Sequence, residues 1–143
     1  MRESEVLNKA YQNYQMTTKG VPAYACDKAV LTGSKNPERV IKDKIEKYLK
    51  WIGHYCVIVD SSAHYNKDVG RYIKSETSLG CPDLIASING KFVGIEVKRI
   101  YENSRDRQSE VQKKVENRII SDKGQYWIVN DFMSFYEMLT KFK

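Results

Sequence analysis

The chain has 143 residues, of which 41% are hydrophobic and 29% charged, as expected for one globular domain with a single core. No apolar run approaches the roughly 18 residues of a membrane span, and residues 1–15 lack the apolar stretch of a secretory signal, so we expect neither a membrane nor a secreted protein. Lysine and arginine exceed aspartate and glutamate by 24 to 18, a net charge of +6, which favours an anionic partner such as nucleic acid.

The three cysteines, Cys26, Cys56 and Cys81, are odd in number and widely spaced. Such spacing favours reduced thiols, and with His54 and His64 as the only histidines no zinc-binding pattern arises. We therefore expect a cytoplasmic protein in which these side chains serve packing or lie on the surface.

The first 35 residues are expected to form an N-terminal extension, a helix plus an arm, ahead of a domain at 36–143. Apolar residues at helical spacing favour an amphipathic helix over 1–17. Glycines and prolines near both ends of 18–37 indicate a connector or arm. The sequence alone leaves open whether this extension folds back, swaps between subunits or binds a partner.

The domain begins with a helix over 37–52, for which Asn36 is a suitable N-cap and Pro37 a suitable first residue. The apolar and β-branched segment 55–60 then predicts a strand. Residues 61–80 lack a regular apolar period, and we expect an exposed loop there.

A β-hairpin is the clearest feature of the sequence. Strands at 83–88 and 91–98 flank Asn89-Gly90, a pair that favours a two-residue turn because both turn positions need a positive φ. With this turn, every pair of facing residues has the same summed number, so the register is fixed along both strands.

A capped helix over 109–121, a strand over 126–129 and a final helix from 132 onward complete the chain. From residue 37 the predicted order is helix, three strands, helix, strand, helix. This order predicts an α/β fold, a three-layer sandwich in which helices cover a mixed central sheet.

Two acids face each other in the predicted hairpin, since the register places Asp83 opposite Glu96. Facing side chains share one side of the sheet with their Cβ atoms about 5 Å apart, where two carboxylates repel each other unless a cation neutralises them. Lys98 lies on the same side, one repeat further along and about 7 Å away. A solvated hairpin face is the simpler explanation, but the apolar neighbours of Glu96 favour a partly buried, functional acid.

Gly80-Cys81-Pro82-Asp83 followed by Gly94-Ile95-Glu96-Val97-Lys98 resembles the signature of the PD-(D/E)XK nucleases, and Ser109-x-x-Gln112 resembles its VRR-NUC branch. The resemblance covers about residues 36–130. It implies an αβββαβα core like that of restriction endonucleases, present in stand-alone phage and bacterial proteins and in DNA-repair enzymes. The expected location is then the cytoplasm of a bacterium or of a phage host.

The resemblance also implies a divalent metal site. Asp83, Glu96 and the backbone carbonyl of Val97 would bind Mg²⁺ or Mn²⁺, together with a glutamate from the first helix of the domain. Lys98 would orient or polarise the attacking water and stabilise charge on the phosphate.

The helix glutamate has two candidates, Glu38 and Glu46. Glu38 lies on the same helical stripe as Ile45 and Leu49, whereas Glu46 lies toward the edge of that stripe, so we favour Glu38. The helix dipole also favours an acid in the first turn, which would explain Glu38 without any metal.

Gln112 has two interpretations as well. Ser109-x-x-Gln112 is a capping box, in which the glutamine side chain returns a hydrogen bond to the backbone of the cap residue. The resemblance implies that Gln112 also borders the active site and takes part in catalysis.

Basic residues crowd the segment after the hairpin, and our candidates for DNA contacts are Arg99, Arg105, Arg107 and Lys113. We therefore expect a metal-dependent DNA endonuclease, structure-selective on branched DNA like the Holliday junction resolvases that share this core and act as homodimers. A nicking or homing-type endonuclease is the nearest alternative. A non-catalytic DNA-binding protein on a nuclease fold is another.

Overall fold

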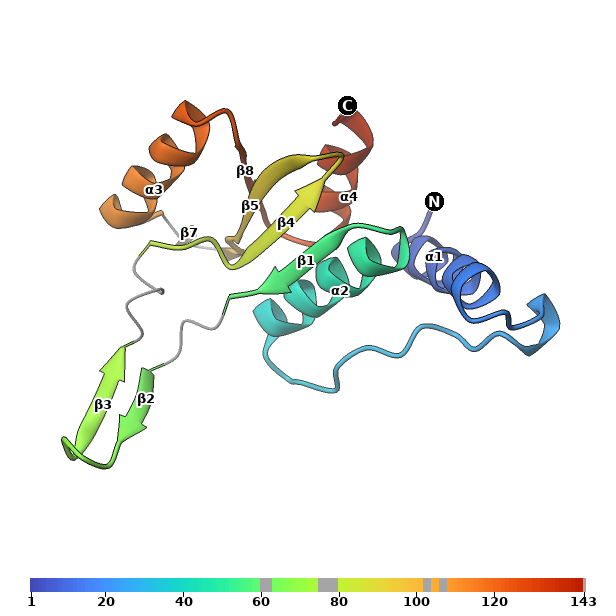
Figure 1. The fold of residues 1–143 in the computed structure, drawn as a ribbon, viewed down its shortest axis with the longest axis horizontal. Helices are drawn as coiled ribbons and strands as arrows, with labels where there is room; N and C mark the ends of the chain where they lie inside the picture. The colour runs from blue at the N-terminus through green and yellow to red at the C-terminus, as the bar shows by residue number, and fades with distance from the viewer. Residues whose placement is uncertain (60–62, 75–79, 102–103, 106–107, 143) are drawn as a thin grey trace.

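The computed structural model describes residues 1–59, 63–74, 80–101, 104–105 and 108–142. It has a mixed α/β fold built on a four-stranded mixed sheet (Figure 1). The strands are ordered β1 (Tyr55–Ile58), β4 (Leu84–Ile88), β5 (Lys91–Val97) and β8 (Gln125–Val129). The first three are antiparallel neighbours, and β8 runs parallel to β5.

Helices lie on both sides of this sheet (Figure 1). On one side α2 (Pro37–Trp51) and α4 (Phe132–Lys141) contact each other and the strands. On the other side α3 (Glu110–Ser121) packs over β8 and reaches β5, where its Ile119 lies beside Gly94. This arrangement agrees with the predicted α/β class and with helices on both faces of a mixed sheet.

The core lies between the sheet and the pair α2 and α4. Alternate residues of β4 and β5 point into it, because successive side chains of a strand face opposite sides. Phe132 and Phe135 of α4 fill the space beside Tyr48 of α2, whose ring lies 5.4 Å from that of Phe132. The fully buried residues of α2 and of the sheet strands are Ile45, Leu49, Leu84, Ala86, Ile88, Val93, Ile95, Val97 and Val129.

The N-terminal helix α1 (Glu3–Thr18) folds back onto α2. Its Val6, Leu7 and Ala10 are buried in the same core, and a Lys44–Glu3 ion pair of 2.8 Å joins the two helices. The segment that follows contains a short 3₁₀ turn, η1 (Ala23–Ala25), and hydrogen bonds back to α1. Residues 1–35 therefore pack on the domain of their own chain.

The β4–β5 hairpin has the predicted register. Ile88 pairs with Lys91 and Leu84 with Ile95, and the intervening pairs keep the same summed number. Asn89 and Gly90 have φ values of +53° and +79°, as a two-residue turn of this kind requires. The asparagine–glycine turn thus determines which side chains share a face.

The prediction of a loop over 61–80 is wrong for part of that segment. The structure has a second hairpin there, β2 (Ala63–Asn66) with β3 (Arg71–Lys74), and residues 75–79 lie outside the described part. The Asn66 side chain accepts hydrogen bonds from the turn, and a cross-strand Tyr65–Tyr72 ring pair supports the strands. Each of these strands has only four residues, which is too short to show a clear apolar period.

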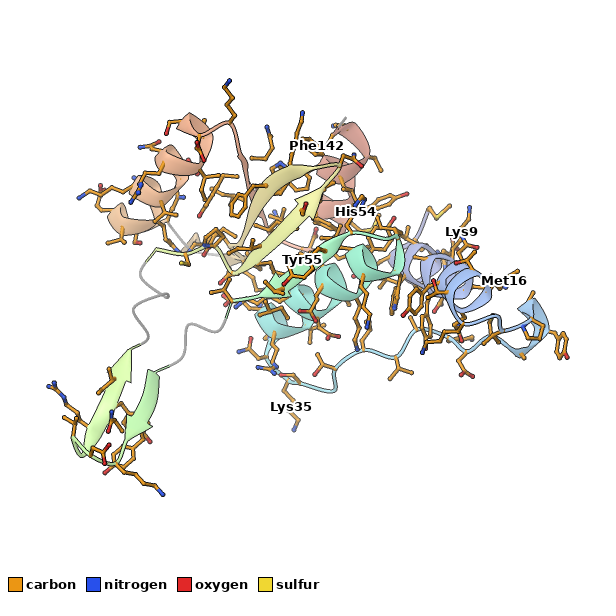
Figure 2. The ribbon with its side chains drawn as sticks, viewed as in Figure 1. Lys9, Met16, Lys35, His54, Tyr55 and Phe142 are labelled. Carbon is orange, nitrogen blue, oxygen red and sulfur yellow. The ribbon has the colours of Figure 1, made fainter. Side chains whose placement is uncertain are left out.

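The β2–β3 hairpin projects from the rest of the protein (Figure 2), and its Tyr65, Tyr72 and Ile73 are exposed. A further short strand pair, β6 (Ile100–Tyr101) with β7 (Ser104–Arg105), follows β5 and was not predicted. Within the described residues, no helix has the length and apolar character needed to cross a membrane.

Gly94 is a position where the packing leaves no room for a side chain. A Cβ there would lie 2.7 Å from Cγ of Pro82, and the proline ring cannot rotate away. We expect Gly94→Ala to lower the free energy of unfolding by about 1–3 kcal/mol through this clash. Gly33→Ala is the control, since nothing lies within 4 Å of its Cβ position. Urea unfolding of both variants measures the difference, and equal stabilities would contradict the prediction.

Candidate active site

Asp83 lies immediately before β4, at the open end of the β4–β5 hairpin. Its Oδ2 accepts a 2.8 Å hydrogen bond from the backbone N–H of Val97, and its own carbonyl accepts one of 2.8 Å from the N–H of Val59. These two bonds hold the Asp83 residue between the flanking strands. The hairpin register therefore continues one step past the last ladder pair and brings Asp83 to Glu96, as predicted.

Glu96 is almost fully buried, with 3% of its surface exposed. Its Oε1 accepts a 2.8 Å hydrogen bond from Nε2 of Gln112 and lies 3.7 Å from Nζ of Lys98. Its Oε2 is buried and has no hydrogen-bond partner among the described residues. A buried carboxylate oxygen left in this way is costly unless it is protonated or binds a cation.

Burial raises the pKa of Glu96 from its ordinary 4.5 to about 8, and the negative charge of Asp83 acts in the same direction. The positive charge of Lys98 opposes them. Glu96 therefore keeps its proton near neutral pH, which removes the repulsion between two facing carboxylates in a dry site.

Gln112 performs both of its predicted structural tasks. Its Oε1 accepts a hydrogen bond from the N–H of Ser109, whose hydroxyl in turn caps the N–H of Gln112, so the capping box of α3 is complete. Its amide Nε2 meanwhile donates to Glu96. The first turn of α3 therefore both starts the helix and orients the buried acid.

Lys42 of α2, which was not among the predicted site residues, reaches the same place. Its Nζ lies 3.3 Å from Oδ1 of Asp83, and both side chains are about one-fifth exposed. Each of the two acids consequently has an ammonium group beside it, Lys42 at Asp83 and Lys98 at Glu96.

These residues fit a divalent cation such as Mg²⁺ or Mn²⁺. Asp83 and Glu96 supply the hard carboxylate oxygens that such ions prefer, including the partnerless Oε2. The carbonyl of Val97 points the same way as its N–H, toward Asp83, because both groups of one residue lie on the same side of a strand. The two carboxylates therefore meet at this end of the hairpin, and the Val97 carbonyl lies on the edge of β5 that faces Asp83.

The third predicted acid, Glu38, does not join Asp83 and Glu96 in the structure. Within the described part of the chain, no group of three or more Asp, Glu, His or Cys side chains could hold a metal ion. Glu38 lies partly buried in the first turn of α2, one helical turn before Lys42, and the structure does not bring it into a cluster with Asp83 and Glu96. Its role as a ligand stays a prediction.

The alternative acid, Glu46, is engaged elsewhere. Its Oε2 accepts a hydrogen bond of 3.2 Å from the N–H of Ile58 on β1. That N–H points away from β4, because the neighbouring N–H of Val59 points toward it. Glu46 therefore binds the free edge of the sheet rather than the site.

Tyr126 of β8 pairs with Gly94, on the face of the sheet that carries Glu96. Burial raises the pKa of its phenol to about 12, and the negative charge of Glu96 acts in the same direction.

Of the four candidate DNA-binding residues, the structure describes the side chains of Arg99 and Lys113. Arg99 lines a surface cavity of about 630 Å³ together with Lys35 and Asp131. Lys113 is exposed and lies 3.7 Å from Glu110 on α3. Arg107 and the side chain of Arg105 lie outside the described part.

Comparison with known proteins gives no relative. No protein-family model matches the chain, no curated protein matches its sequence and no solved structure matches its fold.

The raised pKa of Glu96 predicts how stability depends on pH in the absence of metal. Because the folded-state pKa lies above 4.5, the stabilisation is complete below about pH 4.5 and is lost as the pH rises through about 8. In EDTA we expect the free energy of unfolding to fall from pH 5 to pH 8 by on the order of 3 kcal/mol more in the wild type than in Glu96→Gln. Urea unfolding at both pH values measures this. Equal slopes for the two proteins would refute it.

Proposed function

We propose that this chain is a metal-dependent DNA endonuclease with the restriction-endonuclease-like core of the PD-(D/E)XK nucleases, similar to their VRR-NUC branch. Three features support the proposal. The strand order and the flanking helices fit such a core. Asp83, Glu96, Lys98 and Gln112 lie together at one end of the central hairpin. The chain carries a net charge of +6.

The observation that carries the proposal is the pairing of Asp83 with a buried, partly unsatisfied Glu96. Facing carboxylates in a dry site repel each other, so the pair is costly in a fold that binds no cation there. Retaining both is useful where a divalent cation binds between them. Together with Lys98, which lies beside Glu96, the two acids provide the side chains that a metal-dependent phosphodiesterase uses.

In this proposal Asp83, Glu96 and the Val97 carbonyl hold Mg²⁺ or Mn²⁺, with Glu38 as a further candidate ligand. When bound, such an ion lowers the pKa of water and offsets the charge of the scissile phosphate. Hydrolysis joins the oxygen of water to phosphorus and breaks one P–O bond, and the departing oxygen takes a proton.

The side chains around the acids have separate tasks. Lys98 keeps a positive charge where a non-bridging phosphate oxygen gains negative charge, and it orients the attacking water. Gln112 fixes the rotamer of Glu96 through its 2.8 Å hydrogen bond, so that the free oxygen of the acid faces the site. Arg99, Lys113, Arg105 and Arg107 are the proposed contacts with the DNA backbone.

We further propose that the substrate is branched DNA and that the enzyme is a homodimer, because paired cuts across a junction require two sites. Cytoplasmic location follows from the same interpretation. A nicking or homing-type endonuclease would use the same residues on another DNA structure. Comparing cleavage of a four-way junction with cleavage of supercoiled plasmid distinguishes these alternatives.

Cleavage assays test the proposal directly. We expect the wild type to cut a four-way junction, and more weakly supercoiled plasmid, with Mg²⁺ or Mn²⁺ and not with EDTA. Asp83→Ala and Glu96→Gln remove metal ligands, so their cleavage should fall below detection. Circular dichroism and urea unfolding verify that both variants fold. Absence of cleavage by folded wild type in either metal, with DNA binding retained, would favour the non-catalytic DNA-binding alternative.

The dual role of Gln112 gives a second test. Ser109→Ala and Gln112→Ala both break the capping box, and each should destabilise the protein by about 1 kcal/mol. Only Gln112→Ala also removes the hydrogen bond to Glu96, so only this variant should slow cleavage, by roughly 10- to 100-fold. Junction-cleavage rates at saturating Mg²⁺, beside urea unfolding, separate the two effects. If Ser109→Ala slows cleavage equally, capping alone explains the residue.

A further inference from the structure

The Lys42–Asp83 ion pair occupies one of the atoms that a metal would need. Oδ2 of Asp83 accepts the Val97 N–H, and Oδ1 lies 3.3 Å from Nζ of Lys42. Both oxygens of this carboxylate are therefore engaged. On Glu96, by contrast, Oε2 is left without a partner among the described residues.

A divalent cation at Asp83 and the Lys42 ammonium repel each other. At separations of a few ångströms near a protein surface, a unit charge changes the affinity for a divalent ion by tenfold or more. Lys42 is on a well-defined helix, but its side chain has four rotatable bonds and is 20% exposed. Its ammonium can therefore move into solvent without any movement of α2.

We propose that Lys42 is a resident counter-charge of the candidate metal site. It neutralises Asp83 in the metal-free protein, and a divalent cation must displace it in order to bind. This inference rests on the proposed function, since it concerns the same site. Lys42 is a positioning residue here: it holds the Asp83 rotamer and sets the metal concentration at which the site fills.

The pairing also explains how the fold tolerates the acids before metal arrives. Lys42 and Lys98 each lie within 4 Å of one carboxylate, so each acid has a positive charge beside it. One ammonium comes from α2 and the other from the residue that follows β5. Removing Lys42 leaves Asp83 with its Val97 hydrogen bond and without the neighbouring ammonium, which favours a cation.

Isothermal titration of Mn²⁺ into the full chain, without DNA, tests the inference. We expect Lys42→Met to bind Mn²⁺ about tenfold more tightly than the wild type, because the competing charge is gone. Lys42→Arg keeps the charge and should bind no more tightly than the wild type. Lys47→Met is the matched control: Lys47 is also on α2, but it pairs with Asp43 at 3.3 Å, and its loss should leave the affinity unchanged.

Each outcome separates this inference from the proposed function. If the wild type binds Mn²⁺, Glu96→Gln does not, and Lys42→Met binds no more tightly than the wild type, the counter-charge is wrong and the metal site stands. If neither the wild type nor Lys42→Met binds Mn²⁺, the metal site itself is wrong. Lys42→Gln replaces Lys42→Met if urea unfolding shows the methionine variant unfolded, and the same tenfold increase is expected.

Discussion

The face-to-face placement of Asp83 and Glu96 is the constraint on which the rest of the site depends. Antiparallel pairing brings them together, and burial then makes their repulsion expensive. Neighbouring groups offset this repulsion at each acid. Asp83 has the backbone N–H of Val97 and the ammonium of Lys42 beside it, and Glu96 has the amide of Gln112 and the ammonium of Lys98. One carboxylate oxygen is left over on Glu96. The arrangement therefore depends on the packing of the elements that carry these groups, α2, α3 and the end of β5.

Much of the fold could be predicted because the relevant interactions are local in sequence. Asn89-Gly90 determines the turn, the turn determines the register, and the register determines that Asp83 meets Glu96. The starts of α2 and α3 could also be predicted from the sequence, because Asn36 and Ser109 cap backbone N–H groups only two or three positions away. Local rules of this kind require no knowledge of how helices and sheet are packed together.

What the sequence could not reveal depends on packing between distant segments. Lys42 meets Asp83 across 41 positions of the chain, and nothing in its own surroundings distinguishes it from the other lysines of α2. The return of α1 onto α2 is a contact of the same type. The β2–β3 hairpin escaped prediction for a different reason: its strands have only four residues each, too few for an alternation of apolar and polar residues to mark them.

The site forms where the three layers of the protein meet, and this location links its geometry to the core. On β5, Ile95 and Val97 point into the core while Gly94 and Glu96 point toward α3. A strand cannot shift one set of side chains without shifting the other. The sheet therefore supplies the acids, α3 supplies the amide that orients one of them, and α2 supplies an ammonium for the other. Because all three layers contribute groups to the site, changes in packing far from the acids reach them through the strand itself.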